Sequence, residues 1–340
     1  MASPQRRSSP RHTGRNQVKA LSAVLRIAVA ALSLAAGSAL AQSYPTRPIT
    51  MVVPFAAGGT GEILGRLLAQ HMSTDLKQNV VVELKPGAGS MLGSELVAKV
   101  AAPDGYTVLL NGPPLSINAS LMSLNFDPGR DLVPASGIAG FPQLMVTSAS
   151  SPYRTVQDVV KASKGGANLT FGSSGPGTAS HMAGELFGSL SGVSMTHVPY
   201  KGSGAVYVDL MAERVNLLFD VAGSAIGYVN GGKVRAIGIT SKDRSAALPE
   251  VPTLIEQGVT AYEFLSWFGL FVRAGTPPDV IARLEVAVRN ALNEPAMQER
   301  LKQLGAMPLP ISAAEFGRFY QADIDRWAGL VRTGKVAKLN

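Results

Sequence analysis

Two glycine-rich turns constrain this chain of 340 residues more than any other feature. The first lies at 54–61 and reads PFAAGGTG, and the second lies at 171–178 and reads FGSSGPGT. Each follows an apolar run typical of a buried strand and precedes a run with helical periodicity. Glycine lets backbone approach a ligand closely, and the first N–H groups of a helix have no acceptor within the helix. We therefore expect two backbone cradles that hold a small anion from two sides.

The donors in these turns are the candidate ligand-binding residues. In the first turn, the N–H groups of residues 60–62 have no acceptor within the coming helix, and Thr60 adds a hydroxyl. An ordinary strand-to-helix turn is the alternative interpretation of this segment. The second turn contributes hydroxyl groups and glycine backbone, from Ser173, Ser174, Gly175, Gly177 and Thr178. Because Pro176 stiffens the second turn, less entropy is lost when a ligand binds there.

Three further polar residues lie near the expected ends of strands and helices. His181 stands one turn into the helix after the second glycine turn, where it either faces the ligand or hydrogen-bonds locally and holds the loop. Lys201, in a polar loop at 200–204, either reaches the anion or stays in solvent. Asp220 ends a strand, where open α/β sheets bind their ligands. Its carboxylate would repel a ligand carboxylate but could accept a hydrogen bond from a ligand amine or hydroxyl.

The first 41 residues are predicted to be a cleaved secretory signal peptide. They carry six Lys or Arg residues and no acidic residue, followed by an apolar stretch at 27–36 and a signal-peptidase site, ALA, at 39–41. The remainder has 25 basic and 23 acidic residues, which gives no case for nucleic-acid binding. Because the chain has no Cys and four His without zinc-ligand spacing, we expect neither a metal nor another cofactor.

The rest of the chain alternates strand-like and helix-like segments, which predicts an α/β fold with a parallel sheet. The expected strands are 49–53, 80–84, 107–110, 144–147, 169–171, 195–198, 215–219, 234–239 and 262–272. The expected helices include 62–76, 156–162, 179–190, 205–211, 279–293, 295–304 and 313–331. The length suffices for two lobes, and no linker separates them. With crossings at 141–142 and 264–265, lobe 1 is discontinuous (42–142 and 265–340) and lobe 2 is 143–264.

A set of short motifs then points to a family. They are YPTRPI at 44–49, PFAAGG at 54–59, PGAG at 86–89, PDGYT at 103–107, VPYKG at 198–202 and PEVPT at 249–253. In this order they resemble the Bug-type solute-binding proteins, which are the receptors of tripartite tricarboxylate transporters. The resemblance extends from about residue 44 to about residue 331. One departure is Glu62, where the family usually has Asp.

The resemblance implies a two-lobed periplasmic-binding-protein fold of type II (a Venus flytrap) whose first lobe is discontinuous. It implies a periplasmic receptor, not an enzyme, that holds a small carboxylate between the lobes and passes it to a permease of one large and one small membrane subunit. We expect the receptor to be a monomer. The implied contact residues are Phe55, Gly58, Gly59, Thr60, Gly61, Ser173, Ser174, Gly175, Gly177, Thr178, His181, Gly202 and Ser203.

A periplasmic NAD(P)-binding oxidoreductase is the alternative function. The segment 59–65 is a G-x-G-x-x-x-G run after a strand, and Glu83 stands 22 residues past Gly61, where a ribose-binding acid would lie. An export signal argues against this function, because free NAD is scarce outside the cytoplasm. The segment 227–234 nearly matches a phosphate-binding loop, but Val234 replaces the Ser or Thr that holds magnesium.

Overall fold

The structure is a computed structural model that describes residues 3, 44–307, 309, 312–334, 336, 338 and 339. The predicted signal peptide lies outside these residues, apart from Ser3. The internal contacts divide the chain into residues 1–46 and residues 47–340, and every described helix and strand belongs to the second unit. None of the described helices is both long and apolar enough to cross a bilayer.

Nine described strands form one sheet. They are β1 (Ile49–Val53), β2 (Val80–Leu84), β3 (Thr107–Asn111), β4 (Leu132–Ser148), β5 (Leu169–Ser173), β6 (Met195–Pro199), β7 (Leu217–Val221), β8 (Val234–Ile239) and β9 (Leu265–Arg273). Their order is β2-β1-β3-β9-β4-β7-β5-β6, and β8 also pairs with β4. The β1–β2, β1–β3, β5–β6 and β5–β7 pairs are parallel, whereas β4 and β9 pair antiparallel with their neighbours.

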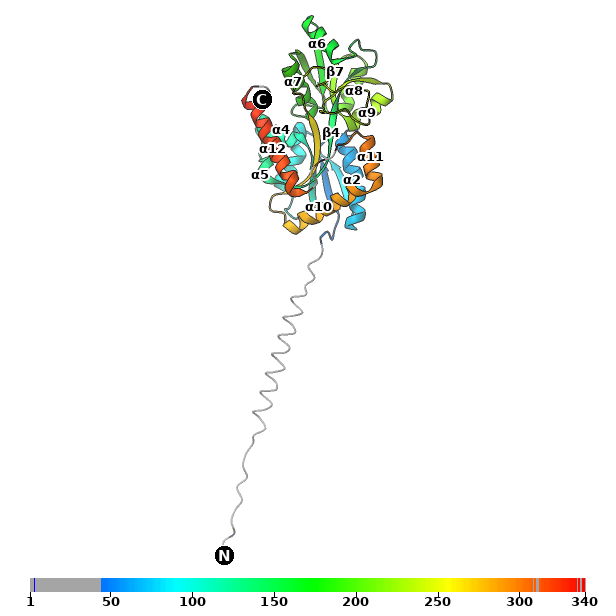
Figure 1. Cartoon of the computed structure of the whole chain (residues 1–340). Coiled ribbons are helices and arrows are strands. Elements are labelled where there is room, and N and C mark those ends of the chain that lie inside the picture. Colours follow the sequence, from blue (N-terminus) through cyan, green and yellow to red (C-terminus); the bar gives the residue numbers. More distant parts are fainter. Residues whose placement is uncertain are drawn as a thin grey trace. The chain divides into compact units, whose positions relative to one another are not determined.

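Strand β4 lies in the middle of this sheet and pairs with strands of both halves. Its segment 132–142 pairs with β9, and its segment 143–148 pairs with β7 and β8. We call β1, β2, β3 and β9 the first half-sheet, and β5, β6, β7 and β8 the second half-sheet. Figure 1 shows β4 passing from the part of the molecule that holds α2 and α10 toward the part that holds α6 and α8. The chain therefore passes from the first half-sheet to the second within the single strand β4.

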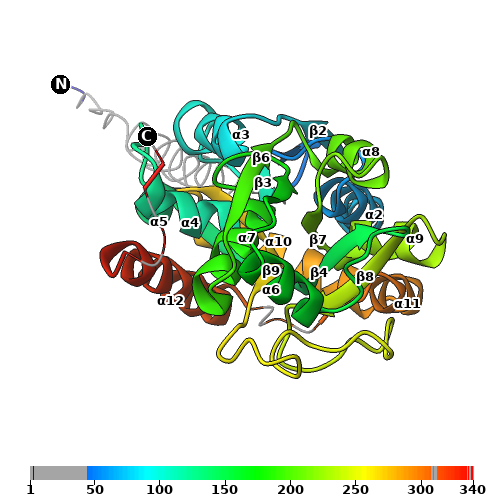
Figure 2. The ribbon, with the colours of Figure 1, turned by 90° about the horizontal axis from the view of Figure 1, so that it is seen from above.

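The helices lie on both sides of the strands, as an α/β fold requires. They are α2 (Thr60–Leu76), α3 (Met91–Glu95), α4 (Pro113–Leu121), α5 (Pro128–Asp131), α6 (Val156–Lys164), α7 (Ala179–Ser191), α8 (Ser203–Met211), α9 (Ala222–Asn230), α10 (Pro278–Asn293), α11 (Pro295–Gln303) and α12 (Ala313–Arg332). Figure 2 shows α4, α5 and α12 on one side and α2, α9 and α11 on the other. Short 3₁₀ and π turns at Ala88–Ser90 and Leu96–Val100 flank α3.

The described elements confirm the predicted α/β class and most of the predicted segments. The strand expected at 262–272 begins later, at Leu265, and β4 begins at Leu132 rather than at Leu144. Helices α4, α5 and α9 were not predicted, and α9 covers part of the segment that nearly matched a phosphate-binding loop. The predicted sheet is mixed rather than parallel, because β9 and β4 run against their neighbours.

Helix α12 packs against the cores of both half-sheets. Its Phe316 and Tyr320 surround the buried Trp267 of β9 with ring centroids 5.6 and 5.7 Å away. About two turns further on, Trp327 packs edge-to-face on Phe264 in the core of the second half-sheet, at 5.7 Å. Because aromatic side chains bury the most apolar area, these contacts make α12 a second connection between the halves.

Candidate ligand site

A cavity of about 690 Å³ lies between the two glycine turns. That volume is within the range of sites that hold small organic ligands. Most of the predicted site residues line it, namely Phe55, Gly59, Thr60, Gly61, Ser174, Gly175, Thr178, Gly202, Ser203 and Asp220. Four predicted residues do not line it: Gly58, Ser173, Gly177 and His181. Lys201 also lines the cavity and is exposed.

Parallel strands explain why distant segments meet at this cavity. Strands β1, β5, β6 and β7 are followed by α2, α7, α8 and α9, so the helix N-termini gather at the carboxyl ends of the strands. Within the described residues, no hydrogen-bond acceptor is found for the N–H groups of Thr60 and Gly61 at the start of α2, or of Ala179 and Ser180 at the start of α7. All four residues line the cavity. Two helix dipoles thus present their positive ends to one space.

The first glycine turn is closed on one side by Glu62. The N–H of Gly58 donates to Glu62 Oε2 at 2.8 Å, and Arg66 Nε donates to Oε1 of the same carboxylate at 2.8 Å. The Gly58 N–H and then Arg66 hold the pKa of Glu62 below its usual value. The N–H of Glu62 donates to Gly59 O at 3.1 Å. Of the donors expected at 60–62, only those of Thr60 and Gly61 are therefore open to a ligand.

The second glycine turn binds its own hydroxyl groups. Thr178 Oγ1 donates to Gly175 O at 2.6 Å and also accepts from the N–H of His181 at 3.5 Å, as the N-cap of α7. The Ser174 N–H donates to Ser180 Oγ at 2.9 Å, and the two hydroxyls lie 2.8 Å apart. These bonds shape the loop, and they leave the N–H groups of Ala179 and Ser180 as its open backbone donors. Sequence reasoning missed these two residues as donors, although the helix predicted from residue 179 already indicated their open N–H groups.

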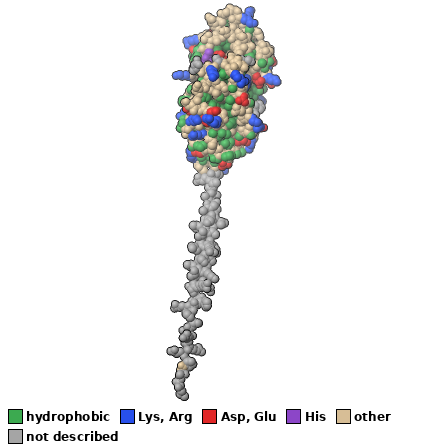
Figure 3. All heavy atoms as spheres, turned by 90° about the vertical axis from the view of Figure 1, so that its left-hand side faces the viewer, with side chains coloured by type: hydrophobic (Ala, Val, Ile, Leu, Met, Phe, Trp, Pro, Cys, Tyr) green, Lys and Arg blue, Asp and Glu red, His purple; other side chains and the backbone are tan. Residues whose placement is uncertain are grey.

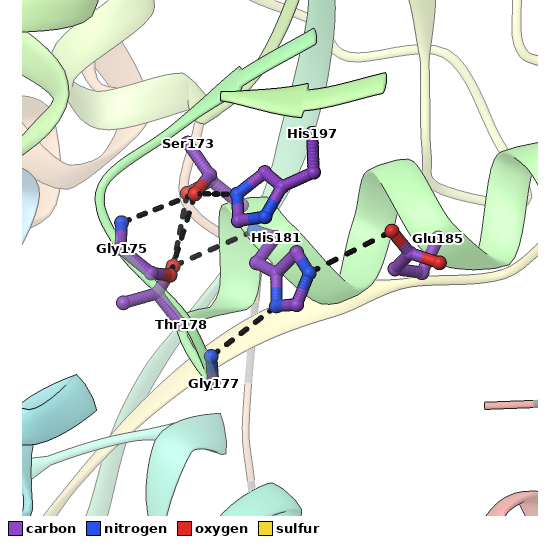
Figure 4. A network of polar contacts seen from close by, with 8 residues as sticks. Ser173, Gly175, Gly177, Thr178, His181, Glu185 and His197 are labelled. Carbon is purple, nitrogen blue, oxygen red and sulfur yellow. Dashed lines mark hydrogen bonds and ion pairs between the residues drawn. The ribbon is translucent and has the colours of Figure 1, made fainter. Parts of the chain in front are cut away.

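A polar network behind the second turn contains two histidines (Figure 4). The Gly177 N–H donates to His181 Nδ1 at 3.2 Å, so His181 holds the loop, which was one of its two expected roles. Its ring stacks on that of His197, with centroids 3.9 Å apart, and its Nε2 lies 3.6 Å from Glu185 Oε1. His197 Nε2 and Ser173 Oγ are 2.6 Å apart.

Burial, and then the neighbouring His181, lower the pKa of His197 from 6.5 to about 4. His197 is consequently neutral at pH 7. Ser173 and Gly177 support the cavity from behind rather than lining it. His197 could not be found from the sequence, because no motif surrounds it in β6 and it meets Phe171 of β5 only through the sheet register.

Asp220 lies buried in the cavity wall and connects it to the start of α2. Its Oδ2 accepts hydrogen bonds from Tyr207 OH at 2.9 Å and from Ser224 Oγ at 2.7 Å. Ser224 Oγ also lies 3.4 Å from the hydroxyl of Thr60. Burial raises the pKa of Asp220 above its usual value, although these hydrogen bonds act in the opposite direction. A raised pKa reduces the repulsion that an ionised Asp220 would exert on a ligand carboxylate.

A third loop, at 87–90, completes the wall and was expected only as a turn. Ala88 and Ser90 adopt φ of 47° and 75°, which side chains other than glycine rarely do. A Cβ atom on Gly89 would lie 2.7 Å from Pro176 O of the second glycine turn. The buried Asn118 of α4 joins these loops, since its Nδ2 donates to Gly89 O at 3.3 Å and to Gly177 O at 3.1 Å. Asn118 could not be found from the sequence, because α4 itself was not predicted.

This geometry can be compared with known proteins. The sequence model of the protein family described as tripartite tricarboxylate transporter family receptor matches residues 64–335. The chain belongs to this family. Protein BugT of Bordetella pertussis is 35% identical over 318 residues, which cover 92% of this chain and 96% of BugT.

Two solved structures of relatives carry organic acids. Rpa4515 of R. palustris with adipate is 32% identical with a TM-score of 0.83, over 87% of this chain and 100% of that one. MatC from Rhodopseudomonas palustris with bound malate is 30% identical with a TM-score of 0.80, over 85% of this chain and 100% of that one. The predicted resemblance and the binding-protein fold are thus confirmed. The family consists of transporter receptors, and these matches give no support to the oxidoreductase alternative.

Neither the surface shown in Figure 3 nor the described residues gather charged side chains into a patch or a metal-ligand cluster. On the face shown in Figure 3, Lys and Arg side chains are scattered among acidic and apolar ones rather than gathered in one patch. In the part of the chain that the structure describes, no group of three or more His, Asp or Glu side chains could hold a metal ion. The cavity therefore offers a ligand mainly backbone donors, hydroxyls and apolar surface.

Proposed function

We propose that this chain is an exported receptor that captures a small organic acid in the cavity and delivers it to a tripartite permease of one large and one small membrane subunit. The mature receptor acts as a monomer in the periplasm after its signal peptide is removed. Membership of the receptor family supports the general role. The adipate and malate complexes of its relatives support an organic acid as the ligand.

The observation that carries the proposal is the convergence of α2 and α7 on one cavity. Their starts provide the open N–H groups of Thr60, Gly61, Ala179 and Ser180. Hydrogen bonds to a charged group contribute about 1.5–3 kcal/mol each. Micromolar affinity requires about 8 kcal/mol. Four such donors can therefore supply this affinity and offset part of the freedom that the ligand loses on binding.

The proposed lobes are 42–142 with 265–340, and 143–264. In support, β4 changes its partners between Pro142, which pairs with Leu265 of β9, and Gln143, which pairs with Val221 of β7. With these boundaries, the α2 cradle belongs to lobe 1 and the α7 cradle to lobe 2. A ligand bound by both would favour the closed arrangement of the lobes.

Removal of one open donor tests the site. Ala179→Pro deletes the N–H at the first position of α7, where proline fits, and Thr178 before it already has the extended backbone that proline requires. Ala179→Gly keeps the N–H and is the matched control. Isothermal calorimetry on protein refolded to remove carried-over ligand should show affinity lower by roughly 10- to 100-fold for the proline variant only. Equal affinity in both variants would contradict the proposed cradle.

A further inference from the structure

Helix α4 differs from the other helices that begin at the cavity. Its first two residues, Pro113 and Pro114, both line the cavity, and proline has no N–H to donate. Helices α2 and α7 offer a ligand open N–H groups at the corresponding positions. Among the helices that begin at the cavity, α4 thus presents ring carbons where α2 and α7 present backbone donors.

These prolines belong to a larger apolar wall, made of Phe55, Pro113, Pro114, Met122 and Phe268. The rings of Phe55 and Phe268 meet edge-to-face with centroids 5.8 Å apart. Phe268 also lies beside the start of α4, because a Cβ atom on Gly112, the residue before Pro113, would lie 3.9 Å from Cδ1 of Phe268.

The apolar wall reaches both glycine turns. Phe55 covers the start of α2, because a Cβ atom on Gly61 would lie 2.3 Å from its Cδ2. Met122, just after α4, touches the second glycine turn, because its Cε would lie 2.9 Å from a Cβ atom on Gly177. A ligand whose carboxylate sits at the starts of α2 and α7 therefore has its remaining atoms within reach of this wall.

The charged side chains around the cavity offer little to a second carboxylate. Among its described lining residues, the ionisable side chains are Lys201, which is exposed, Asp220, which is acidic, and Tyr200, whose hydroxyl donates to Asp209 at 2.7 Å. No arginine is among them. A second carboxylate placed against the apolar wall would exchange water for ring and methyl carbons, which is strongly unfavourable.

We propose that the site selects organic acids with a single carboxylate and an apolar body, such as an aromatic ring or a hydrocarbon chain, over di- and tricarboxylates. This inference rests on the proposed function and specifies its ligand class. The carboxylate binds the N–H groups at the starts of α2 and α7. The body lies against the apolar wall, where each buried methylene strengthens binding by removing carbon surface from water.

A homologous series of ligands tests the inference on the unaltered protein. Calorimetry with butanoate, hexanoate and octanoate should show affinity rising roughly fourfold for each added methylene until the cavity is filled. Benzoate should bind more tightly than succinate or citrate. Tighter binding of succinate or citrate than of benzoate and hexanoate would overturn the ligand class while leaving the receptor function intact. No response to any of these acids would overturn the proposed function as well.

Variants test whether the apolar wall causes the expected preference for ligands with one carboxylate. Pro113→Ser returns an N–H and adds a hydroxyl at the first position of α4, and it should improve the affinity for succinate relative to hexanoate several-fold. Pro295→Ser is the matched control, since Pro295 is the first residue of α11, is exposed and does not line the cavity. Met122→Gln should weaken hexanoate binding roughly tenfold, while Met122→Leu should retain it. The inference is overturned if Met122→Gln binds hexanoate as well as Met122→Leu does, and this pair also decides the matter if Pro113→Ser fails to fold.

Discussion

The two glycine turns resemble each other in sequence, but they hold themselves in place by different means. The first turn is braced by a charged side chain outside the loop, because Glu62 accepts the Gly58 N–H while Arg66 holds the carboxylate. The second turn is braced from within by its hydroxyls, and from behind by His181. The same pattern of glycines before a helix therefore yields one loop with space around it and one that is tightly enclosed.

The largest expected effect separates the glycines of the two turns. In Gly177→Ala, the new Cβ atom would lie 2.3 Å from Asn118 Oδ1 at a φ of 71°, so we expect a loss of about 2–5 kcal/mol of stability from strain and overpacking. In Gly58→Ala, with φ of 83° and nothing within 4 Å, only the backbone penalty of about 1–2 kcal/mol applies. Urea unfolding of both variants measures this difference. Equal losses would mean that the turns are enclosed to the same degree.

A smaller effect is expected where the second turn meets α4. Asn118→Ala removes the donor that Gly89 O and Gly177 O share, which should reduce stability by about 1–3 kcal/mol. It should also weaken ligand binding, because the two loops on either side of the cavity lose their connection. Asn125→Ala is the control, since Asn125 is exposed, its side chain donates to Glu95 at 3.3 Å, and neither residue lines the cavity. Faster ligand release in stopped-flow measurements is expected for Asn118→Ala and not for the control.

The smallest effect is a difference in pH response. The pKa of His197 is about 4 in the folded protein against 6.5 for the ordinary group, so the unfolded chain binds more protons between these values. Stability at the second turn should therefore fall as the pH is lowered from about 6.5 toward 4. Because His197 is only half-buried, solvent screens part of this effect, and we expect a change in Tm of roughly a few degrees.

The first turn should respond only in more acid solution. The pKa of Glu62 is held below its usual 4.5, so its contribution is present above that value and is lost as the pH falls below it. As the pH is lowered, the protection of the Gly177 amide against hydrogen exchange should consequently be lost at a higher pH than the protection of the Gly58 amide. In His197→Gln the Gly177 response should disappear, whereas His71→Gln, on α2 outside the network, should keep it. Simultaneous loosening of both turns would contradict their separate bracing.

The sequence allowed the position of the site to be predicted because that position depends on local patterns. A strand, a glycine turn and a helix in succession are visible in the residues, and in an α/β sheet they place each turn at the same edge. For this reason Thr60, Gly61, Ser174 and Thr178 could be assigned to a common cavity, and the family resemblance added Gly202 and Ser203.

The direction of individual polar groups could not be predicted in the same way. The hydroxyls of Ser173 and Thr178 can bind either a ligand or protein groups. Ser173 contacts His197 of the next strand, and Thr178 donates to Gly175 O of its own loop, and neither choice is visible in the sequence pattern. Helix α4 was missed because Pro113 and Pro114 usually mark a break, although proline is also favourable in the first turn of a helix. Because α4 was missed, the bridging Asn118 and the part of the apolar wall formed by Pro113 and Pro114 were missed as well.

The shared strand β4 has a consequence for building hybrid receptors from relatives. Side chains alternate between the two faces of a strand, and β4 is buried along nearly its whole length. A hybrid that joins the front part of one relative to the rear part of another near residue 143 must preserve this alternation. A shift of a single residue at the junction would turn each following side chain to the opposite face and misplace every strand that pairs with it.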